Sequence, residues 1–217
     1  MSNTTRPGGY FITGTDTEIG KSHIACCIAM GLIQQGHTVA PRKPIASGCI
    51  KQPDGSLLSV DAYRLQQASQ THDSLQTICP YQFEAPISPA RAIRQANQTI
   101  GLEDLKQTCQ APASQFLLVE GAGGFLSPLC DNALNADLAA QLQLPIILVV
   151  GNRLGCINHA LLTVEAIQQR GLKLAAILLN DIQADSDLDN LTDLKNLLPN
   201  QHIIHQPHQA KPTAILL

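Results

Sequence analysis

The stretch Gly14-Thr15-Asp16-Thr17-Glu18-Ile19-Gly20-Lys21-Ser22 decides the fold of this chain. It lies between the apolar run Tyr10–Thr13 and a helix-like run that begins at Lys21. A strand, a glycine-containing loop, Gly-Lys-Ser and a helix, in this order, are typical of a loop that holds the phosphates of a nucleotide. Backbone N–H groups and the positive end of the helix dipole face the phosphates in such a loop. The sequence therefore predicts a phosphate-binding loop at residues 14–22.

Two side chains of this loop carry the expected chemistry. Lys21 brings a mobile positive charge to the β- and γ-phosphates, and the Ser22 hydroxyl is a hard oxygen ligand for Mg²⁺. The spacing departs from the usual pattern at one point, because Gly14 lies one residue early and Thr15 stands where the first glycine is usual. A plain glycine-rich turn with an exposed lysine is the alternative interpretation.

Composition limits the class of protein. The chain has 217 residues, of which 44% are hydrophobic and 14% charged, so we expect residues 1–217 to form one α/β domain. A net charge of −3 without a basic block argues against nucleic acid as a partner. The polar start predicts no signal peptide, and the longest apolar run, residues 145–150, is too short to cross a bilayer. Seven cysteines without a Cys-x-x-Cys pattern indicate reduced, buried thiols in a cytoplasmic protein.

Strand and helix patterns alternate along the chain. The predicted strands are Tyr10–Thr13, Thr38–Arg42, Gln115–Val119, Ile146–Val150 and Leu174–Leu179. The predicted helices are Lys21–Gln35, Ser59–Ala68, Leu102–Gln107, Ala136–Gln143, Ile157–Gln169 and Leu188–Leu198. Continuously apolar strands favour a parallel sheet that is buried on both faces. We therefore expect a P-loop NTPase-like three-layer α/β fold with a mostly parallel sheet flanked by helices, and loops with short helices over the ligand edge at residues 47–100.

Polar residues follow several of these strands, where ligands bind in such sheets. Lys43 leaves the second strand, and a second cation near one phosphate chain suggests another anionic group; a surface lysine before a turn is the alternative. Glu120 ends an apolar strand and is a candidate carboxylate near Mg²⁺. Asp61 is a second candidate, with helix capping as its alternative. Asn180, followed by Asp181, carries an amide that can pair with adenine, or forms a turn.

Two further patterns carry less chemistry. His202, His205 and His208 recur at intervals of three, which leaves metal binding as a minor alternative, since proline interrupts the segment and no carboxylate or cysteine cluster accompanies it. Asn97-Gln98-Thr99 matches the glycosylation pattern, but a cytosolic protein does not meet that machinery.

Several of these motifs occur together in one order along the chain. They are GTDTEIGKS at 14–22, KPIASG at 43–48, Asp61, VEGAGG at 119–124, GNRLGCINHALLT at 151–163 and Asn180-Asp181. As a set they resemble the dethiobiotin synthetases of the biotin pathway, from about Tyr10 to Asp181. The resemblance implies closure of a cyclic urea on 7,8-diaminopelargonate (7,8-diaminononanoate) with CO₂ and ATP, and a homodimer whose active sites are shared between subunits.

The resemblance also implies a role for each site residue. Lys43, Lys21 and Thr17 are implied to be catalytic, and Ser22, Asp61 and Glu120 to hold Mg²⁺. Residues implied to contact ATP are Glu18, Ile19, Gly20, Lys21, Ser22, His23, Asp61, Glu120, Gly121, Ala122, Gly123, Asn180 and Asp181. Residues implied to bind the diamine substrate are Ser47, Cys156 and Asn158, the last two from the neighbouring subunit. The chain departs from the family in two ways: residues 204–209 match the second adenine-side segment only loosely, and the helix after Asn180 lacks a tyrosine.

Two other classes are possible on the same fold. A partner-regulated ATPase switch of the ParA/MinD type resembles Lys-Gly-Gly-x-Gly-Lys in its phosphate loop, whereas Asp16, Thr17 and Glu18 fill the first three places here. A cobalamin-pathway amide ligase resembles this chain but has an added glutaminase domain, for which 217 residues are too few. Both are weaker matches than the synthetase.

Overall fold

A six-stranded sheet forms the centre of the computed structural model, which describes residues 8–209 and 211–217. Every neighbouring pair of strands in this sheet is parallel. The spatial order is β12 (Ile203–Gln206), β11 (Leu174–Asp181), β10 (Ile146–Asn152), β1 (Gly9–Gly14), β7 (Phe116–Glu120) and β2 (Val39–Arg42). The predicted parallel sheet is confirmed, and so are its five predicted strands.

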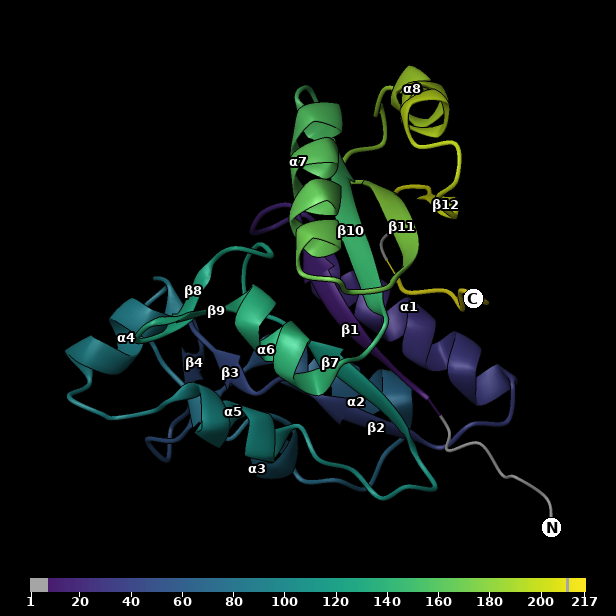
Figure 1. Ribbon diagram of the computed structural model, residues 1–217. Coiled ribbons are helices and arrows are strands. Elements are labelled where there is room, and N and C mark those ends of the chain that lie inside the picture. The colour runs from purple at the N-terminus through teal and green to yellow at the C-terminus, as the bar shows by residue number, and fades with distance from the viewer. Residues whose placement is uncertain (1–7, 210) are drawn as a thin grey trace, which may run out of the picture.

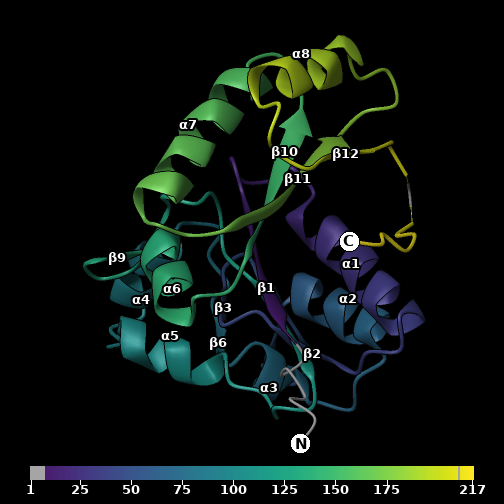
Figure 2. The same cartoon turned by 45° about the vertical axis from the view of Figure 1, so that its right-hand side comes forward.

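Helices cover both faces of the sheet, as Figures 1 and 2 show from two directions. One face carries α1 (Lys21–Gln34) and α2 (Val60–Ser69). The other face carries α5 (Leu102–Thr108), α6 (Asn135–Leu142), α7 (Cys156–Gln169) and α8 (Asp189–Leu197). These are the six helices that the sequence predicts, and the three-layer arrangement is confirmed.

The segment of residues 45–95 adds short elements beside the ends of the strands. It contains the paired strands β3 (Ile45–Ala46) and β6 (Tyr81–Gln82), the hairpin of β4 (Ile50–Lys51) and β5 (Leu57–Leu58), and the helices α3 (Leu75–Ile78) and α4 (Pro89–Gln95). A further hairpin of β8 (Pro128–Cys130) and β9 (Ala133–Leu134) packs near α4. Prediction gave loops and short helices here and missed the short strands.

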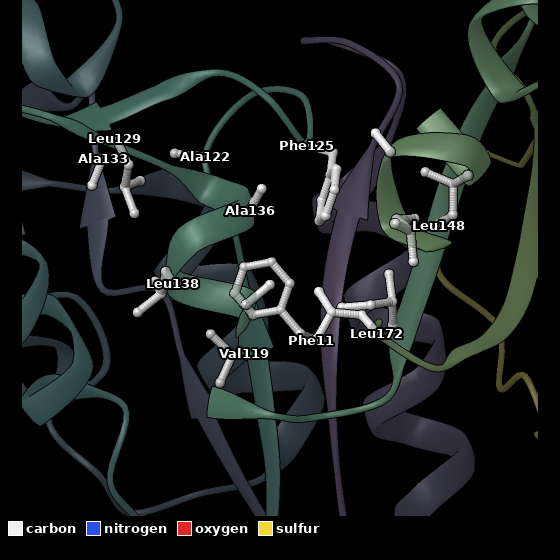
Figure 3. Close-up of a cluster of buried hydrophobic side chains, with 14 of the residues drawn as sticks. Phe11, Val119, Ala122, Phe125, Leu129, Ala133, Ala136, Leu138, Leu148 and Leu172 are labelled. Carbon is white, nitrogen blue, oxygen red and sulfur yellow. The ribbon is translucent and has the colours of Figure 1, made fainter. Parts of the chain in front are cut away.

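The core forms on both faces because successive residues of each strand point to opposite sides. Phe11 of β1 packs under α6 and α7 with Leu148 and Phe125, as Figure 3 shows. Its neighbour Ile12 packs against α1 on the other side, in a cluster that includes Val149. Each fully buried side chain of this size stabilises the fold by roughly 1.5–3 kcal/mol. The register between neighbouring strands, with Gly14 beside Val149 and Ile12 beside Glu120, determines which residues lie next to one another where the strands end.

A parallel sheet brings the carboxyl ends of its strands to one edge. At this edge β1 ends at Gly14, β2 is followed by Lys43, β7 ends at Glu120 and β11 ends at Asp181. Within the described residues, no helix is both long and apolar enough to span a membrane.

Candidate active site

The phosphate loop joins β1 to α1 at the predicted residues. Glu18 (φ 58°) and Gly20 (φ 86°) both adopt left-handed backbone conformations, which turn the loop back on itself. A concave backbone of this kind points N–H groups inward and favours an anion. A Cβ at Gly20 would overlap the amide of Asn180, and a Cβ at Gly14 would lie 2.6 Å from Ile19 Cδ1. A side chain at position 14 would therefore have to displace Ile19 and Lys21, although Gly14 stands one residue early in the motif.

Lys21 is the first residue of α1 and is largely buried. Its Nζ donates a hydrogen bond to the carbonyl oxygen of Asp16 at 2.5 Å, so the loop holds its own lysine. Burial and repulsion by Lys43 lower the pKa of Lys21 to about 8, against an opposing attraction by Glu120. An anion placed in the loop would favour the charged form of Lys21 and compete with Asp16 for the ammonium group.

Glu120 is the centre of the site. Ser22 Oγ and Lys43 Nζ both donate to Glu120 Oε1, at 2.7 Å and 2.5 Å. Lys43 Nζ also lies 3.5 Å from Asp61 Oδ2. Burial lowers the pKa of Lys43, but attraction by Glu120 and Asp61 outweighs burial and raises it. Burial raises the pKa of Asp61, but attraction by Lys43 and the hydrogen bond from Ser22 outweigh burial and lower it. The Asp61 carboxylate is therefore ionised at neutral pH.

The same cluster has an oxygen free for a cation. Glu120 is fully buried, and its Oε2 has no hydrogen-bond partner among the described residues. The Ser22 hydroxyl and the Asp61 carboxylate lie beside it and are hard oxygen donors, as Mg²⁺ prefers. Within the described residues, no group of three or more His, Cys, Asp or Glu forms a metal site. The residues present fit Mg²⁺ that is shared with phosphates and water rather than held by a closed protein cage.

A residue that sequence reasoning missed fixes the loop after β7. Asn135, at the start of α6, is fully buried, and its Oδ1 accepts from Ala122 N at 3.1 Å. Its Nδ2 donates to the carbonyl oxygens of Ala122 and Gly124. A Cβ at Gly121 would come within 2.9 Å of the same Oδ1. Asn135 thus fixes the loop on both sides of Gly123. The N–H of Phe125, which donates to the Gly14 carbonyl oxygen at 2.9 Å, joins this loop to the phosphate loop. In sequence Asn135 resembles only a helix cap.

The pair Asn180-Asp181 ends β11, as predicted. Asn180 Nδ2 donates to the carbonyl oxygen of Ile19 at 3.0 Å and so ties β11 to the phosphate loop. Asp181 Oδ1 accepts from Asn152 Nδ2 at 2.7 Å, and its Oδ2 lies 2.8 Å from His205 Nε2. His208 Nδ1 lies 3.3 Å from the Asp181 carbonyl oxygen. Two of the three C-terminal histidines therefore join β12 and the segment after it to β11.

Other predicted site residues border this centre. Thr17 is exposed on the phosphate loop opposite Gly123, and Ser47 is half-buried after β3. His23 lines a cavity of about 480 Å³ between α1 and α2. Burial and repulsion by His208 and Arg64 lower the pKa of His23.

The bend between β10 and α7 contacts the phosphate loop through the ion pair of Arg153 with Asp16. Cys156 is buried at the first position of α7, Asn158 is exposed two residues later, and Leu154 is fully exposed. An open groove of about 400 Å³ runs beside this helix. It is lined by Thr15, Gly124, Phe125, Leu126, Ser127, Pro128, His159, Leu162 and Thr163. Within one chain, the structure brings Lys21, Ser22, Lys43, Asp61 and Glu120 together, while Ser47, Cys156 and Asn158 lie outside their hydrogen-bond network.

Solved structures share this architecture. A ParA family ATPase from Chlorobium tepidum TLS matches with a TM-score of 0.55 and 17% identity, over 94% of this chain and 86% of that one. The MinC:MinD cell division protein complex of Aquifex aeolicus matches with a TM-score of 0.56 and 14% identity, over 94% of this chain and 82% of that one. Identities this low establish the fold alone, which is that of the P-loop NTPases.

Sequence relatives establish the family within this fold class. Residues 8–211 match the AAA domain family. ATP-dependent dethiobiotin synthetase BioD 1 of Escherichia coli O157:H7 is 41% identical over 199 residues, covering 88% of this chain and 86% of the relative. ATP-dependent dethiobiotin synthetase BioD of Pseudescherichia vulneris is 42% identical over 194 residues, covering 88% and 80%. This chain belongs to the dethiobiotin synthetase family of ATP-dependent ligases, and the prediction of a synthetase is favoured over the ParA/MinD-type switch.

Proposed function

We propose that this chain closes a cyclic urea on 7,8-diaminopelargonate with CO₂ and ATP, giving dethiobiotin, ADP and phosphate. One observation carries the proposal beyond family membership. A second buried lysine, Lys43, stands beside the phosphate loop and shares Glu120 with Ser22. A nucleotide alone needs only Lys21, so the second ammonium group suits another anion that reacts at the γ-phosphate.

The chemistry needs such an arrangement because each species is anionic. A substrate amine adds to CO₂ and loses a proton, which gives a carbamate. A carbamate oxygen attacks the γ-phosphorus and ADP leaves, which gives a carbamic–phosphoric anhydride. The neighbouring amine then attacks the carbonyl carbon, loses a proton and expels phosphate as the ring closes. Positioning and charge neutralisation supply most of the catalysis in phosphoryl transfer.

Each residue of the cluster has a part in these steps. Lys21 stabilises charge on the β- and γ-oxygens, while Lys43 holds the carbamate and stabilises the charge that develops there. Thr17 lies beside the reacting groups, Ser47 binds the diamine and Asn180 reads adenine. The backbone of residues 18–22 and 121–123 wraps the phosphates.

Mg²⁺ is proposed to bind beside Glu120 Oε2, the carboxylate oxygen that has no hydrogen-bond partner among the described residues. Ser22, Asp61 and Glu120 would hold it, directly or through water, and the cation would neutralise charge between the β- and γ-phosphates. The buried, unpartnered Glu120 Oε2 among the described atoms supports this assignment.

A two-fold homodimer is proposed from the exposed apolar residues near the groove. Leu126, Leu154 and Leu162 are each at least half exposed; Leu126 and Leu162 line the groove, and Leu154 lies in the bend before α7. Large apolar side chains that gather on an exposed surface are typical of interaction sites. In the dimer, Asn158 and the backbone of Cys156 bind the carboxylate of the substrate in the partner's site, where the N-terminus of α7 favours an anion.

A cytoplasmic location is proposed from the cysteines. All seven are free and buried, and burial raises the pKa of Cys26, Cys79 and Cys109 to about 12. Such thiols are unreactive and suit a reducing compartment.

A product assay tests the proposed function. The purified chain is incubated with ATP, Mg²⁺, 7,8-diaminopelargonate and bicarbonate, and ADP is measured together with the mass of dethiobiotin. We expect ADP release that requires both the diamine and bicarbonate, with one dethiobiotin for each ADP. ADP release that is independent of the diamine would instead indicate an ATPase.

A further inference from the structure

Asp16 joins the phosphate loop to a segment far away in the sequence. Its Oδ1 accepts from the N–H of Thr17 at 2.8 Å, and its carbonyl oxygen accepts from Lys21 Nζ at 2.5 Å. Its Oδ2 accepts from Arg153 Nη2 at 2.5 Å. Arg153 belongs to the bend between β10 and α7, so a single residue contacts both the nucleotide loop and this bend.

The carboxylate of Asp16 is ionised when it makes these contacts. The hydrogen bond from Thr17 N–H lowers the pKa of Asp16, burial opposes it, and the hydrogen bond and charge of Arg153 lower the pKa as well. His159 of α7 makes a further, smaller contribution that also lowers the pKa of Asp16. The pair with Arg153 is about half exposed on each side, so it contributes little to folding stability and is free to rearrange.

Arg153 lies just before the N-terminus of α7. Leu154 is fully exposed, and Cys156 and Asn158 begin α7. Under the proposed function, on which this inference rests, these residues bind the carboxylate of the diamine in the partner's site. A shift of Arg153 would therefore be felt in the neighbouring active site.

Nucleotide binding changes the contacts of Asp16. In the structure Lys21 Nζ is held by the Asp16 carbonyl oxygen, and a triphosphate in the loop competes for the same ammonium group. A triphosphate that takes the Lys21 ammonium group would break its hydrogen bond to the Asp16 carbonyl oxygen. Because Asp16 Oδ2 accepts a hydrogen bond from Arg153, a shift of the Asp16 backbone would move the bend as well.

We propose that the Asp16–Arg153 pair couples ATP binding in one subunit to diamine binding in its partner. Both residues are positioning residues, since neither touches a substrate in this account. The coupling is positive and reciprocal: bound nucleotide increases the affinity for the diamine, and bound diamine increases the affinity for the nucleotide by the same factor. A partly exposed ion pair supports a factor on the order of fivefold.

Calorimetry on the intact dimer tests this coupling. The Kd of 7,8-diaminopelargonate is measured with and without a saturating non-hydrolysable ATP analogue and Mg²⁺. We expect the analogue to lower the Kd of the diamine on the order of fivefold in the wild-type protein. In Arg153→Gln and Asp16→Asn the analogue should leave this Kd nearly unchanged. The double variant should lose no more of the coupling between the two ligands than either single variant does. Arg153→Lys should retain most of this coupling.

Controls separate the coupling from other effects. Arg94→Gln breaks another exposed ion pair, with Asp131 at 2.8 Å, and should keep the wild-type coupling. Full coupling in Arg153→Gln, or none in the wild-type protein, would overturn the inference. If the wild-type protein makes dethiobiotin in the product assay while coupling is unaffected by Arg153→Gln, only this inference fails; if it makes none, the proposed function fails as well.

Discussion

The charge of Lys21 depends on what occupies the phosphate loop. Its pKa is lowered to about 8 in the structure, mainly by burial and then by Lys43. The charge of a bound triphosphate favours the ammonium form and raises the pKa in the complex. Protonated Lys21 is therefore the binding form, and nucleotide binding takes up a proton where the free enzyme has lost it.

This gives a prediction for the pH dependence of binding. The affinity for a non-hydrolysable ATP analogue should be constant well below pH 8 and should fall by at most about tenfold per pH unit above it. Calorimetry in buffers of different ionisation enthalpy should detect proton uptake near pH 8–9. Lys21→Arg, which stays charged, should show neither the fall nor the uptake. Equal behaviour of the wild-type protein and this variant would remove Lys21 as the titrating group.

Lys43 gives a prediction that separates the two lysines. Lys43→Gln keeps a hydrogen-bond donor near the buried Glu120 but removes the charge that the carbamate needs. We expect diamine-dependent phosphate release to fall on the order of 10²- to 10³-fold, which is typical of losing one preorganised electrostatic contact. Affinity for the ATP analogue should change by less than about threefold, since Lys21 carries the nucleotide.

Lys21→Ala is the comparison for this experiment, and a thermal melt checks that Glu120 remains accommodated. A loss of nucleotide affinity in Lys43→Gln as large as that in Lys21→Ala would show that both lysines serve the nucleotide, and the carbamate role would be wrong.

Single residues were predictable where the chemistry is local. Lys21 and Ser22 follow from the loop motif, and Glu120 from its place after an apolar strand. Asn135 was not predictable, because an asparagine at a helix start is common, and only folding places it against the loop after β7. The hydrogen bond from Asn180 to Ile19 was not predictable either, because the two residues are 161 positions apart and only folding brings them together.

Helix α1 shows how one element serves both the site and the core. Its N-terminus forms the phosphate loop, and its middle is crossed by the C-terminal segment, where Ile215 N donates to the Cys27 carbonyl oxygen at 3.0 Å. A Cβ at Gly31 would overlap the Ile215 carbonyl oxygen. Gly31 is therefore needed for close backbone approach rather than for helix geometry.

This contact gives a prediction on stability. Gly31→Ala adds up to about 1 kcal/mol of helix propensity, but it displaces Ile215, whose burial stabilises by roughly 1.5–3 kcal/mol. We expect a net decrease of about 1 kcal/mol or more in the free energy of unfolding, measured by urea denaturation. In the double variant with Ile215→Ala, the two losses should not add, because both release the same segment. A more stable Gly31→Ala protein would show that the segment is not bound to α1.

Elements were predicted as far as their patterns were strong. The strand β10 is continuously apolar and was found with nearly correct bounds, whereas β12 was missed. Its sequence, Ile-Ile-His-Gln, has no clear period, and its conformation depends on pairing with β11 and on the contact between His205 and Asp181. The two-residue strands of residues 45–82 are likewise fixed by partners and not by local propensity.

At the scale of the whole molecule, the single chain holds only part of the proposed site. The cluster around Glu120 lies within one subunit, while Cys156 and Asn158 lie in the first turn of α7, outside this cluster. The proposed dimer places these residues in the partner's site, so each active site draws on two chains.

Mixing of inactive subunits tests this arrangement. Lys43→Gln and Asn158→Arg should each give an inactive homodimer. A heterodimer of the two, purified through different tags, has one intact site and one doubly altered site, so we expect about half of the wild-type turnover. Heterodimers that form but stay inactive would mean that each subunit binds the whole substrate by itself.

Oxygen atoms that start in CO₂ report directly on whether a carbamate is phosphorylated. The reaction is run briefly with doubly ¹⁸O-labelled ¹³CO₂, ATP, Mg²⁺ and the diamine, and both products are analysed by mass spectrometry. If the carbamate is phosphorylated, one labelled oxygen passes to phosphate and the other stays with ¹³C in the urea carbonyl of dethiobiotin. We predict one ¹⁸O in phosphate for each ¹³C-labelled ring formed, and phosphate without label alongside labelled dethiobiotin would contradict the account.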